Sequence, residues 1–439
     1  MLINGTNYEF ISFFLLIYCL INIVDSIGEK INYNLLIVLF SIIQLLISPI
    51  LVYRLYNNES FMIAYGYNMQ ISQSIYFGFI IPALIAMYAG ILIPFKNVNK
   101  NRIKTKDIIK ACRVYLFNKS SIGILLMIIG LLSGILEPFV PTEGKYILYL
   151  FSKLLYIGIF YIYFSEIKNK IYYIITGLTA LLVQTILAGM FGDLVYTAIL
   201  AILLLLIGKK INIFLKYFIV LFGLFLIIIL QSIKSDFRNK TWHGNLNVNE
   251  TNSNIFTSLL IQSLTNPSLI LEKQSLMPMV SRFNQGMIQA RVMEYVPKYR
   301  PYQNGTTIFN SVISTFVPRF LWPDKPEAGG KWNIEYFTGF KIEGYSMNIG
   351  PFGEAYGNFG VFGGIIFMFL YGVFFNLSFS YLFNLSIKRP TIILWFPILF
   401  LNSIQIETDI LMTVNSLIKN CLFMAFCFWA ADRFLRIQL

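Results

Sequence analysis

Long apolar stretches separated by short polar connections make up most of the chain. A helix needs about 20 mostly apolar residues to cross the hydrocarbon core of a bilayer. About eleven stretches approach that length, at residues 7–25, 32–53, 71–94, 118–137, 145–164, 171–188, 191–207, 211–230, 358–384, 391–406 and 414–432. The pattern predicts an all-α polytopic integral membrane protein. The tenth stretch is the least regular, because it contains Pro397 and ends in the polar run QIETD.

The first apolar stretch is expected to stay in the protein as a helix. It lacks the basic n-region and the small-residue cleavage site of a signal peptide, and a second long apolar stretch follows it closely.

The charges of the connections predict an orientation. Segment 95–119 holds eight basic residues against the single acid Asp107, and cytoplasmic connections carry an excess of Lys and Arg. Alternate connections along the chain are also basic, with Lys30, Lys168, Lys170, Lys209, Lys210, Lys216, Lys388, Arg389, Arg433 and Arg436. We therefore expect the N-terminus outside and the C-terminus in the cytoplasm.

This orientation divides the chain into three regions. Residues 1–230 carry eight expected spans, residues 231–357 form one large outer segment, and residues 358–439 carry the last three spans. Apolar residues recur in pairs every four positions in the stretch TTIFNSVISTFVPRFLW of the outer segment. That spacing predicts an amphipathic helix, which Pro318 should kink or end.

Composition supports a membrane protein. The chain of 439 residues is 57% hydrophobic and 13% charged, whereas soluble domains are about 25% charged. The net charge of +13 is explained by basic cytoplasmic connections, so we expect no nucleic-acid partner. Four cysteines without CxxC spacing and one histidine, His243, leave no ligand set for a multi-histidine or CxxC metal site. We expect no metal and no cofactor.

Two basic places in the outer segment are candidate binding sites. In the stretch 316–332, Arg319, Lys325 and Lys331 lie among prolines, glycines and two tryptophans. Arginine and lysine held near a membrane surface can bind a phosphate or diphosphate group; the alternative is an interfacial anchor loop. In SRFNQG, Arg282 begins a helical pattern after an apolar run, and it can equally be an ordinary surface residue of that helix.

The third place is the stretch NIGPFGEAYGNFGVFGG at 348–364. Glycines at 350, 353, 357, 360 and 364 form one stripe on a helix, and such stripes let helices pack closely. Glu354 and Asn358 lie four residues apart and share a neighbouring face. Glu354 could be a general base for a hydroxyl group, or it could simply cap the end of a packing helix.

Together these stretches resemble the O-antigen and capsular polysaccharide polymerases, the oligosaccharide repeat-unit polymerases of Wzy type. The resemblance covers about 280–370 and consists of RFNQG, FVPRFLWPDKP, a glycine-rich link and SMNIGPFGEAYGNFGVFGG. About a dozen spans with one large late outer loop also fit that family.

The resemblance implies a lipid-carrier-dependent glycosyltransferase of GT-C-like architecture on the outer face of the bacterial plasma membrane. Such a polymerase would join undecaprenyl-diphosphate-linked oligosaccharide repeat units into a surface polysaccharide. A chain-length regulator and a flippase of the same pathway are the expected partners besides the lipid bilayer. Arg319 and Glu354 are the expected catalytic residues, and the expected substrate-binding residues are Arg282, Lys325, Lys331, Asn348 and Asn358.

Two other functions remain open. An O-antigen ligase has a similar topology and the same class of donor, and it is expected to rely on an outer-loop histidine. Because His243 lies far in sequence from the matching motifs, the sequence favours the polymerase. A polysaccharide flippase or transporter usually shows repeated halves and sites on broken helices, and we detect no repeat in this sequence.

Overall fold

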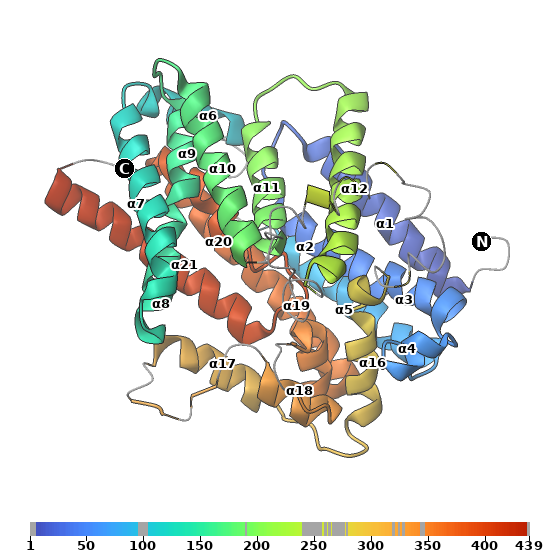
Figure 1. Ribbon diagram of the computed structural model, residues 1–439. Coiled ribbons are helices and arrows are strands. Elements are labelled where there is room, and N and C mark those ends of the chain that lie inside the picture. The colour runs from blue at the N-terminus through green and yellow to red at the C-terminus, as the bar shows by residue number, and fades with distance from the viewer. Residues whose placement is uncertain are drawn as a thin grey trace.

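The computed structural model describes residues 6–94, 104–188, 191–238, 280–317, 330–342 and 347–436, with isolated positions at 257–258, 261, 265, 277, 321–323 and 325–326. All regular structure in these residues is helical (Figure 1). The α-helices and helical turns are α1 (Asn7–Ser26), α2 (Tyr33–Ile42), η2 (Ile43–Ile47), α3 (Ser48–Leu51), η3 (Val52–Tyr56), α4 (Ser60–Ala64), α5 (Gln73–Leu92), α6 (Thr105–Leu116), α7 (Ser120–Leu136), η5 (Glu137–Phe139), α8 (Thr142–Ser152), α9 (Leu154–Phe164), α10 (Lys170–Ala188), α11 (Phe191–Leu205), α12 (Ile213–Arg238), α16 (Gly286–Tyr295), α17 (Thr306–Phe316), α18 (Lys331–Thr338), α19 (Gly350–Lys388), η7 (Pro390–Trp395), α20 (Phe396–Leu399), α21 (Ile410–Ala430) and η8 (Ala431–Leu435).

Within the described residues, seven helical segments are long and apolar enough to cross a membrane. They are Asn7–Ser26, Tyr33–Tyr56, Gln73–Leu92, Ser120–Phe139, Gly144–Phe164, Gly350–Lys388 and Ile410–Phe434. Four shorter apolar helices occupy Lys170–Ile186, Gly192–Leu205, Ile213–Phe225 and Pro390–Leu399. Each stretch expected as a span coincides with one of these segments, so the expected all-helical architecture of a membrane protein is confirmed for this part of the chain.

The basic connections gather at one end of the helix bundle. The connection after α1 lies against the one after α11, and α6 packs against η7. The contacts that join them are Gly208 N–H to Gly28 O (2.8 Å), Glu166 N–H to Phe117 O (2.8 Å), Lys209 Nζ to the ring of Tyr163 (5.9 Å) and Arg389 to Asp432 (3.1 Å). The alternate connections that are basic in the sequence thus lie at one shared end of the bundle, which we call the basic end.

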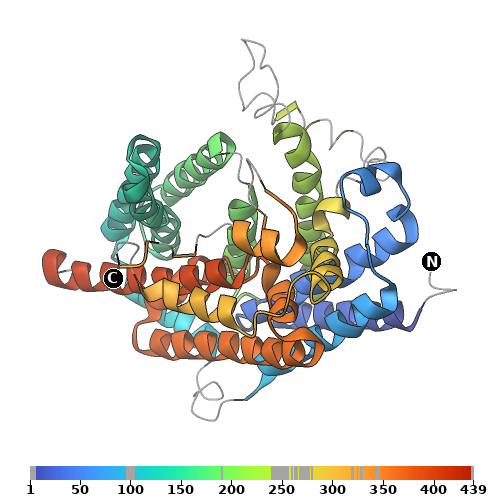
Figure 2. The ribbon, with the colours of Figure 1, turned by 90° about the horizontal axis from the view of Figure 1, so that it is seen from below.

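The outer segment covers the opposite end. Helices α16, α17 and α18 lie along the lower edge of the molecule in Figure 1. Figure 2 shows α17 (gold) running between α21 (red) and α19 (orange-red). Gln289 of α16 donates a hydrogen bond to Ile349 O at 2.7 Å, which ties this layer to the start of α19.

Helices α5 and α19 pack closely against each other, and two glycines make the approach possible. A β-carbon on Gly90 would overlap the carbonyl oxygen of Phe369, and one on Gly372 would overlap that of Met87. Small residues allow such backbone-to-backbone packing, which gains many dispersion contacts at once. The pair forms a rigid support for the beginning of α19.

The segment between α19 and α21 differs from a regular span. Only Pro390–Leu399 is helical, about 15–20 Å of rise, and the chain then runs in turns through residues 400–409. Glu354 contacts the start of α21 and Arg389 pairs with Asp432 at its end, so α19 and α21 run in the same direction. The segment 390–409 must therefore return the chain through the bundle. Its non-helical half is mostly buried in protein, which is what irregular backbone inside a bilayer would require.

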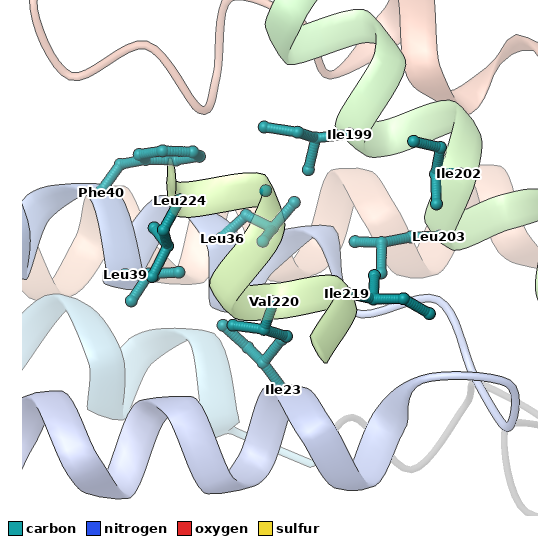
Figure 3. Close-up of a pocket in the computed structure, with 11 residues that line it drawn as sticks. Ile23, Leu36, Leu39, Phe40, Ile199, Ile202, Leu203, Ile219, Val220 and Leu224 are labelled. Carbon is teal, nitrogen blue, oxygen red and sulfur yellow. The ribbon is translucent and has the colours of Figure 1, made fainter. Parts of the chain in front are cut away.

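An apolar groove lies between α1, α2, α11 and α12 (Figure 3). Its walls carry hydrocarbon side chains and one glycine: Ile23, Leu36, Leu39, Phe40, Ile199, Ile202, Leu203, Ile219, Val220, Gly223 and Leu224. Because the described side chains that line it are all apolar, this groove can hold hydrocarbon, and those side chains offer no chemistry.

Candidate functional site

Glu354 lies near the start of α19 and is fully buried, with 0% of its surface exposed. Its Oε1 atom accepts a hydrogen bond from the backbone N–H of Ile410 at 2.8 Å. Its Oε2 atom is buried and has no hydrogen-bond partner among the described residues. The carboxylate therefore joins the beginnings of α19 and α21 while keeping one oxygen free.

A second buried carboxylate, Asp409, stands beside it. Asp409 caps α21 by accepting a hydrogen bond from Met412 N–H at 2.6 Å, and its Oδ2 atom likewise has no partner in the described part of the chain. Burial raises the pKa of Asp409 to about 6, against the lowering effect of the helix N–H groups. We call Glu354 and Asp409 the carboxyl pair. No third carboxylate, histidine or cysteine completes a metal-binding group with them in the described residues.

Helix α19 is broken at Gly360, whose φ of 65° and ψ of −157° lie outside the helical region. A break frees carbonyl groups one turn earlier. Two backbone N–H groups of the outer segment take them, since Gln303 donates to Gly357 O at 3.1 Å and Asn304 donates to Asn358 O at 3.0 Å. The outer segment thus completes the hydrogen bonding of the interrupted helix.

Asn358 reinforces this junction with its side chain. Its Nδ2 atom donates to Thr307 Oγ1 at 2.7 Å and to Glu354 O at 2.8 Å, and its Oδ1 atom accepts from Gly305 N–H at 3.0 Å. The residue is fully buried. Every polar atom of Asn358 is used within the protein, so in this structure it holds α17 and α19 together rather than presenting a group to a substrate.

The glycine stripe of α19 packs mostly against side chains of the outer segment. A β-carbon on Gly353 would lie 2.5 Å from Gln289 Oε1, and one on Gly357 would lie 2.5 Å from the ring of Phe337. Gly364, further along, faces Phe79 of α5. The stripe is therefore a packing surface, as expected, but its main partner is the outer segment and not a neighbouring span.

Two half-buried lysines from different regions of the chain influence each other electrostatically. Lys325 of the outer segment donates to Val317 O at 2.9 Å and lies close enough to Lys419 of α21 for their positive charges to interact. The Lys419 ammonium group rests 4.7 Å from the ring centre of Tyr146. Both lysines are half-buried. Like charges that interact at a partly dry surface favour an anion near them.

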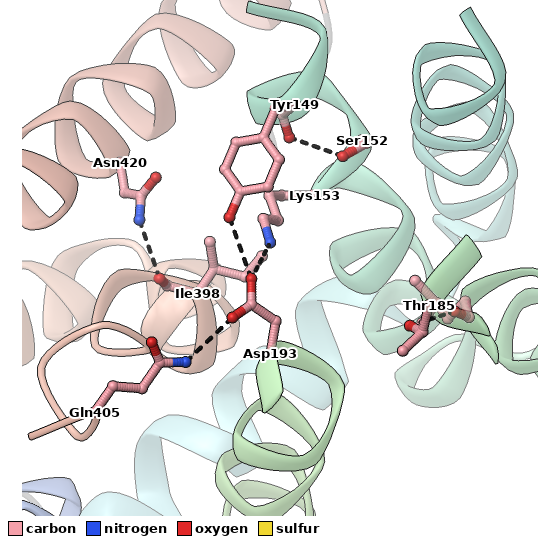
Figure 4. A network of polar contacts seen from close by, with 9 residues as sticks. Tyr149, Ser152, Lys153, Thr185, Asp193, Ile398, Gln405 and Asn420 are labelled. Carbon is pink, nitrogen blue, oxygen red and sulfur yellow. Dashed lines mark hydrogen bonds and ion pairs between the residues drawn. The ribbon is translucent and has the colours of Figure 1, made fainter. Parts of the chain in front are cut away.

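A third lysine, Lys153, lies in a polar network inside the bundle (Figure 4). Lys153, at the junction of α8 and α9, pairs with Asp193 at 3.9 Å and lies 4.3 Å from the ring centre of Tyr149. Tyr149 and Gln405 donate hydrogen bonds to the two oxygens of Asp193, at 3.4 and 3.1 Å. An ionisable residue inside a membrane-spanning segment usually has a function.

The other expected site residues lie in different surroundings. Lys331 is exposed as the first residue of α18, and Arg282 is half-buried just before α16. Asn348 is half-buried against Gly330, and its Oδ1 atom has no partner in the part of the chain that the structure covers. Arg319 and His243 lie outside the described residues.

The structure does not bring the expected base and the lysines into direct contact. Glu354 touches α21 at Ile410, and Lys419 follows nine residues later, about 13 Å along the helix axis. Sequence reasoning missed Asp409, Lys419 and the role of Lys153. Their presence in or beside apolar stretches is the sequence feature that could have identified these ionisable residues. That feature alone does not tell which side chains meet.

Comparison with known proteins identifies one family. A family model described as "Domain of unknown function (DUF8712)" matches residues 57–380. The chain belongs to this family. Searches of curated proteins and of solved structures found no match. The matched range contains Glu354, Lys153 and Lys325 but ends before Asp409 and Lys419. In the carboxyl pair, one residue therefore lies inside the matched range and the other lies after it. The same holds for Lys325 and Lys419.

Proposed function

We propose that the protein polymerises undecaprenyl-diphosphate-linked oligosaccharide repeat units into a surface polysaccharide. The polymerase would transfer a growing glycan from its lipid carrier to the terminal sugar of the next lipid-linked unit. The resemblance of residues 280–370 to Wzy-type polymerases supports this proposal. The structural observation that carries it is the position of two half-buried lysines, Lys325 of the outer segment and Lys419 of α21, near enough for their charges to interact.

The lysines suit the charge that the reaction produces. When the bond between the sugar and the diphosphate breaks, its electrons stay on the diphosphate oxygen, and preorganised cations stabilise that negative charge. Lys325 and Lys419 supply two cations at the protein surface, and Arg319 and Arg282 are proposed to assist them. The products are the extended glycan on the acceptor lipid and free undecaprenyl diphosphate.

The acceptor hydroxyl must lose its proton as it forms the new glycosidic bond. Glu354 is the proposed base, acting through its free Oε2 atom. Because Glu354 is fully buried, the acceptor sugar would have to enter beside Asp409 by displacing part of the segment 400–409. Lys331 and Asn348 are proposed to bind the sugars at the edge of the site. Asn358 is proposed to support them by holding the outer segment in place.

The same proposal includes the orientation in the membrane. We place the basic end in the cytoplasm, since cytoplasmic connections are enriched in Lys and Arg. The N-terminus and the outer segment then lie outside the bacterial plasma membrane, the C-terminus lies inside, and eleven crossings follow. A GT-C-like enzyme with a flippase and a chain-length regulator as partners fits that arrangement.

The deciding experiment is reconstitution in liposomes with a defined lipid-linked repeat unit, followed by sizing of the glycan products. The wild-type protein should give a ladder of long chains. The double variant Lys325→Gln/Lys419→Gln should lower the rate at least tenfold, whereas Lys341→Gln, an exposed lysine of the same outer segment, should leave it unchanged. Absence of any chain longer than one unit with folded wild-type protein would overturn the proposal.

An O-antigen ligase is distinguished by its product. In cells, loss of a polymerase leaves single repeat units, whereas loss of a ligase leaves long chains on the lipid carrier. Accumulation of long carrier-linked chains after deletion would therefore favour the ligase.

One structural feature favours a transporter as the second candidate function. Transporters often bind substrate at discontinuous helices, and ionisable residues inside membrane segments often mark ion or proton pathways. Helix α19 is broken at Gly360, close to the carboxyl pair. Measured flux of lipid-linked glycan across vesicles that contain only this protein, without chain growth, would favour transport over polymerisation.

A further inference from the structure

The apolar groove between α1, α2, α11 and α12 can be reached from the surface of the bundle (Figure 3). Ile202 of α11 lines the groove and is 48% exposed. The space measures about 80 Å³, several times what one water molecule needs, and an apolar space of this kind stays dry. In a bilayer this groove can therefore take part of a hydrocarbon chain.

Gly223 of α12 gives the groove part of its width. At Gly90 and Gly372 an added β-carbon would overlap a neighbouring backbone, whereas at Gly223 it would meet nothing within 4 Å. Gly223 therefore contributes open space to the groove and not a helix–helix contact. A longer side chain at this position has room to occupy part of the groove.

One lysine lies on the same face of α12 as the groove wall. Lys216 precedes the lining residues Ile219, Val220 and Gly223 by three, four and seven residues, and residues at these spacings share one face of a helix. Lys216 is half-buried in the first turn of α12, nearer the basic end than the groove. In the part of the chain that the structure describes, it forms no ion pair with an acid.

The connections beside Lys216 bring further positive charge to this end of the groove. Gly208 N–H donates to Gly28 O at 2.8 Å, which holds the connection after α1 against the one after α11. Exposed lysines on these two connections are Lys30, Lys209 and Lys210.

Acids offset this charge only in part. The described acids at this end of the four helices are Asp25 and Glu29. Asp25 follows the groove residue Ile23 by two positions, which turns it about 200° around the axis of α1 and away from the groove. The mouth of the groove is therefore basic, while its interior is apolar.

We propose that this groove binds an anionic phospholipid, with one acyl chain beside Gly223 and the headgroup phosphate at Lys216. The ammonium group of Lys216 would donate hydrogen bonds to the phosphate, and the N-terminus of α12 beside it also favours negative charge. Basic pockets between transmembrane helices are known to bind anionic headgroups in this way. The narrow space suits an unbranched acyl chain better than a polyprenyl chain, which carries a methyl group on every isoprene unit.

This lipid site does not depend on the proposed polymerase activity. Its assignment to the cytoplasmic leaflet rests on the orientation proposed above. Protein that binds the phospholipid through Lys216 but makes no long glycan would disprove the polymerase and leave the lipid site standing.

The first test concerns charge. Full-length protein in detergent is titrated with phosphatidylglycerol or phosphatidylcholine, and bound lipid is measured by native mass spectrometry. Lys216→Gln should weaken binding of phosphatidylglycerol about fivefold, the usual contribution of one lysine, and should leave binding of phosphatidylcholine unchanged. Lys216→Arg keeps the charge and should retain the affinity. Lys168→Gln, at an exposed lysine of another basic connection, is the control and should change neither.

The second test concerns the groove. Gly223→Leu should exclude the acyl chain, so phosphatidylglycerol should raise the thermal midpoint of the wild type but not that of this variant. Gly78→Leu in α5, where an added carbon likewise meets nothing within 4 Å, should respond to the lipid as the wild type does. This control detects a general effect of a larger side chain on a helix surface.

Three results would overturn the proposal. One is an equal loss of affinity in Lys216→Gln and Lys168→Gln, which would mean attraction to the basic surface as a whole. Another is an unchanged response of Gly223→Leu to phosphatidylglycerol. The third is tighter binding of undecaprenyl phosphate than of phosphatidylglycerol, which would assign the groove to a polyprenyl lipid.

Discussion

The carboxylate of Glu354 accepts a hydrogen bond from the backbone N–H of Ile410, 56 residues away along the chain. This single bond joins the start of the broken helix α19 to the start of α21. It also brings Glu354 next to Asp409, so that two buried carboxylates each keep one free oxygen. A residue singled out as a base is therefore also a structural link, and the two roles can be separated by mutation.

Replacing Glu354 by Gln should separate structure from charge. The amide oxygen of Gln can still accept the bond from Ile410 N–H, so the thermal midpoint in detergent should stay close to that of the wild type. Glu354→Ala leaves that N–H buried and unsatisfied, which costs about 1–3 kcal/mol of unfolding free energy. If Glu354 is the base, both variants should stop chain growth; long glycans made by Glu354→Gln at normal protein level would contradict that role.

Asp409 should make stability depend on pH. Its pKa is about 6 in the folded protein, above the value of about 3.9 expected when unfolded. The folded state therefore binds the proton more tightly, and the free energy of unfolding should fall as pH rises from about 4 to about 6, by about 2–3 kcal/mol.

Asp409→Asn should remove this dependence, because Asn still caps α21 without a charge. The variant should melt higher than the wild type at pH 7.5 and no higher at pH 4. Asp107→Asn is the matched control, since Asp107 lies in the first turn of α6 but is exposed. Parallel melting curves of wild type and Asp409→Asn across this range would contradict the raised pKa.

The break in α19 should require glycine at position 360. Its φ and ψ lie in a region that is essentially restricted to glycine, and a β-carbon there would also lie 3.2 Å from the ring of Tyr302. Gly360→Ala should lower stability by about 1–3 kcal/mol, measured as a drop in thermal midpoint. Gly78→Ala in α5, where a β-carbon meets nothing within 4 Å, should be neutral or slightly stabilising; equal effects of the two changes would argue against the break.

The contact between α5 and α19 should tolerate no side chain at position 372. Gly372→Ala places a β-carbon on the carbonyl of Met87 and should cost about 1–3 kcal/mol because the helices must separate. Gly372→Leu should cost more and lower the yield of folded protein. Gly223→Ala in α12, where the added carbon has open space, provides the control. A normal melting profile for Gly372→Leu would show that the two helices are not held at this distance.

The sequence alone determined where the helices lie. The thickness of a bilayer requires long apolar stretches, and the structure has helices at each of them. Charge in the connections was also informative, because the basic connections do meet at one end of the bundle. Apolar stretches are a local property of the chain, and the charge of the connections is a sum over each connection. Hydropathy and composition are therefore enough to identify both.

Only the tertiary structure decided which polar groups meet. Asp409 beside Glu354, and Lys419 over the ring of Tyr146, are pairs from distant parts of the chain. The tenth apolar stretch looked like a span, yet half of it is irregular backbone, because the surrounding helices bury its polar end and satisfy its hydrogen bonds. Burial of this kind depends on helix packing, and no single stretch of sequence contains that information.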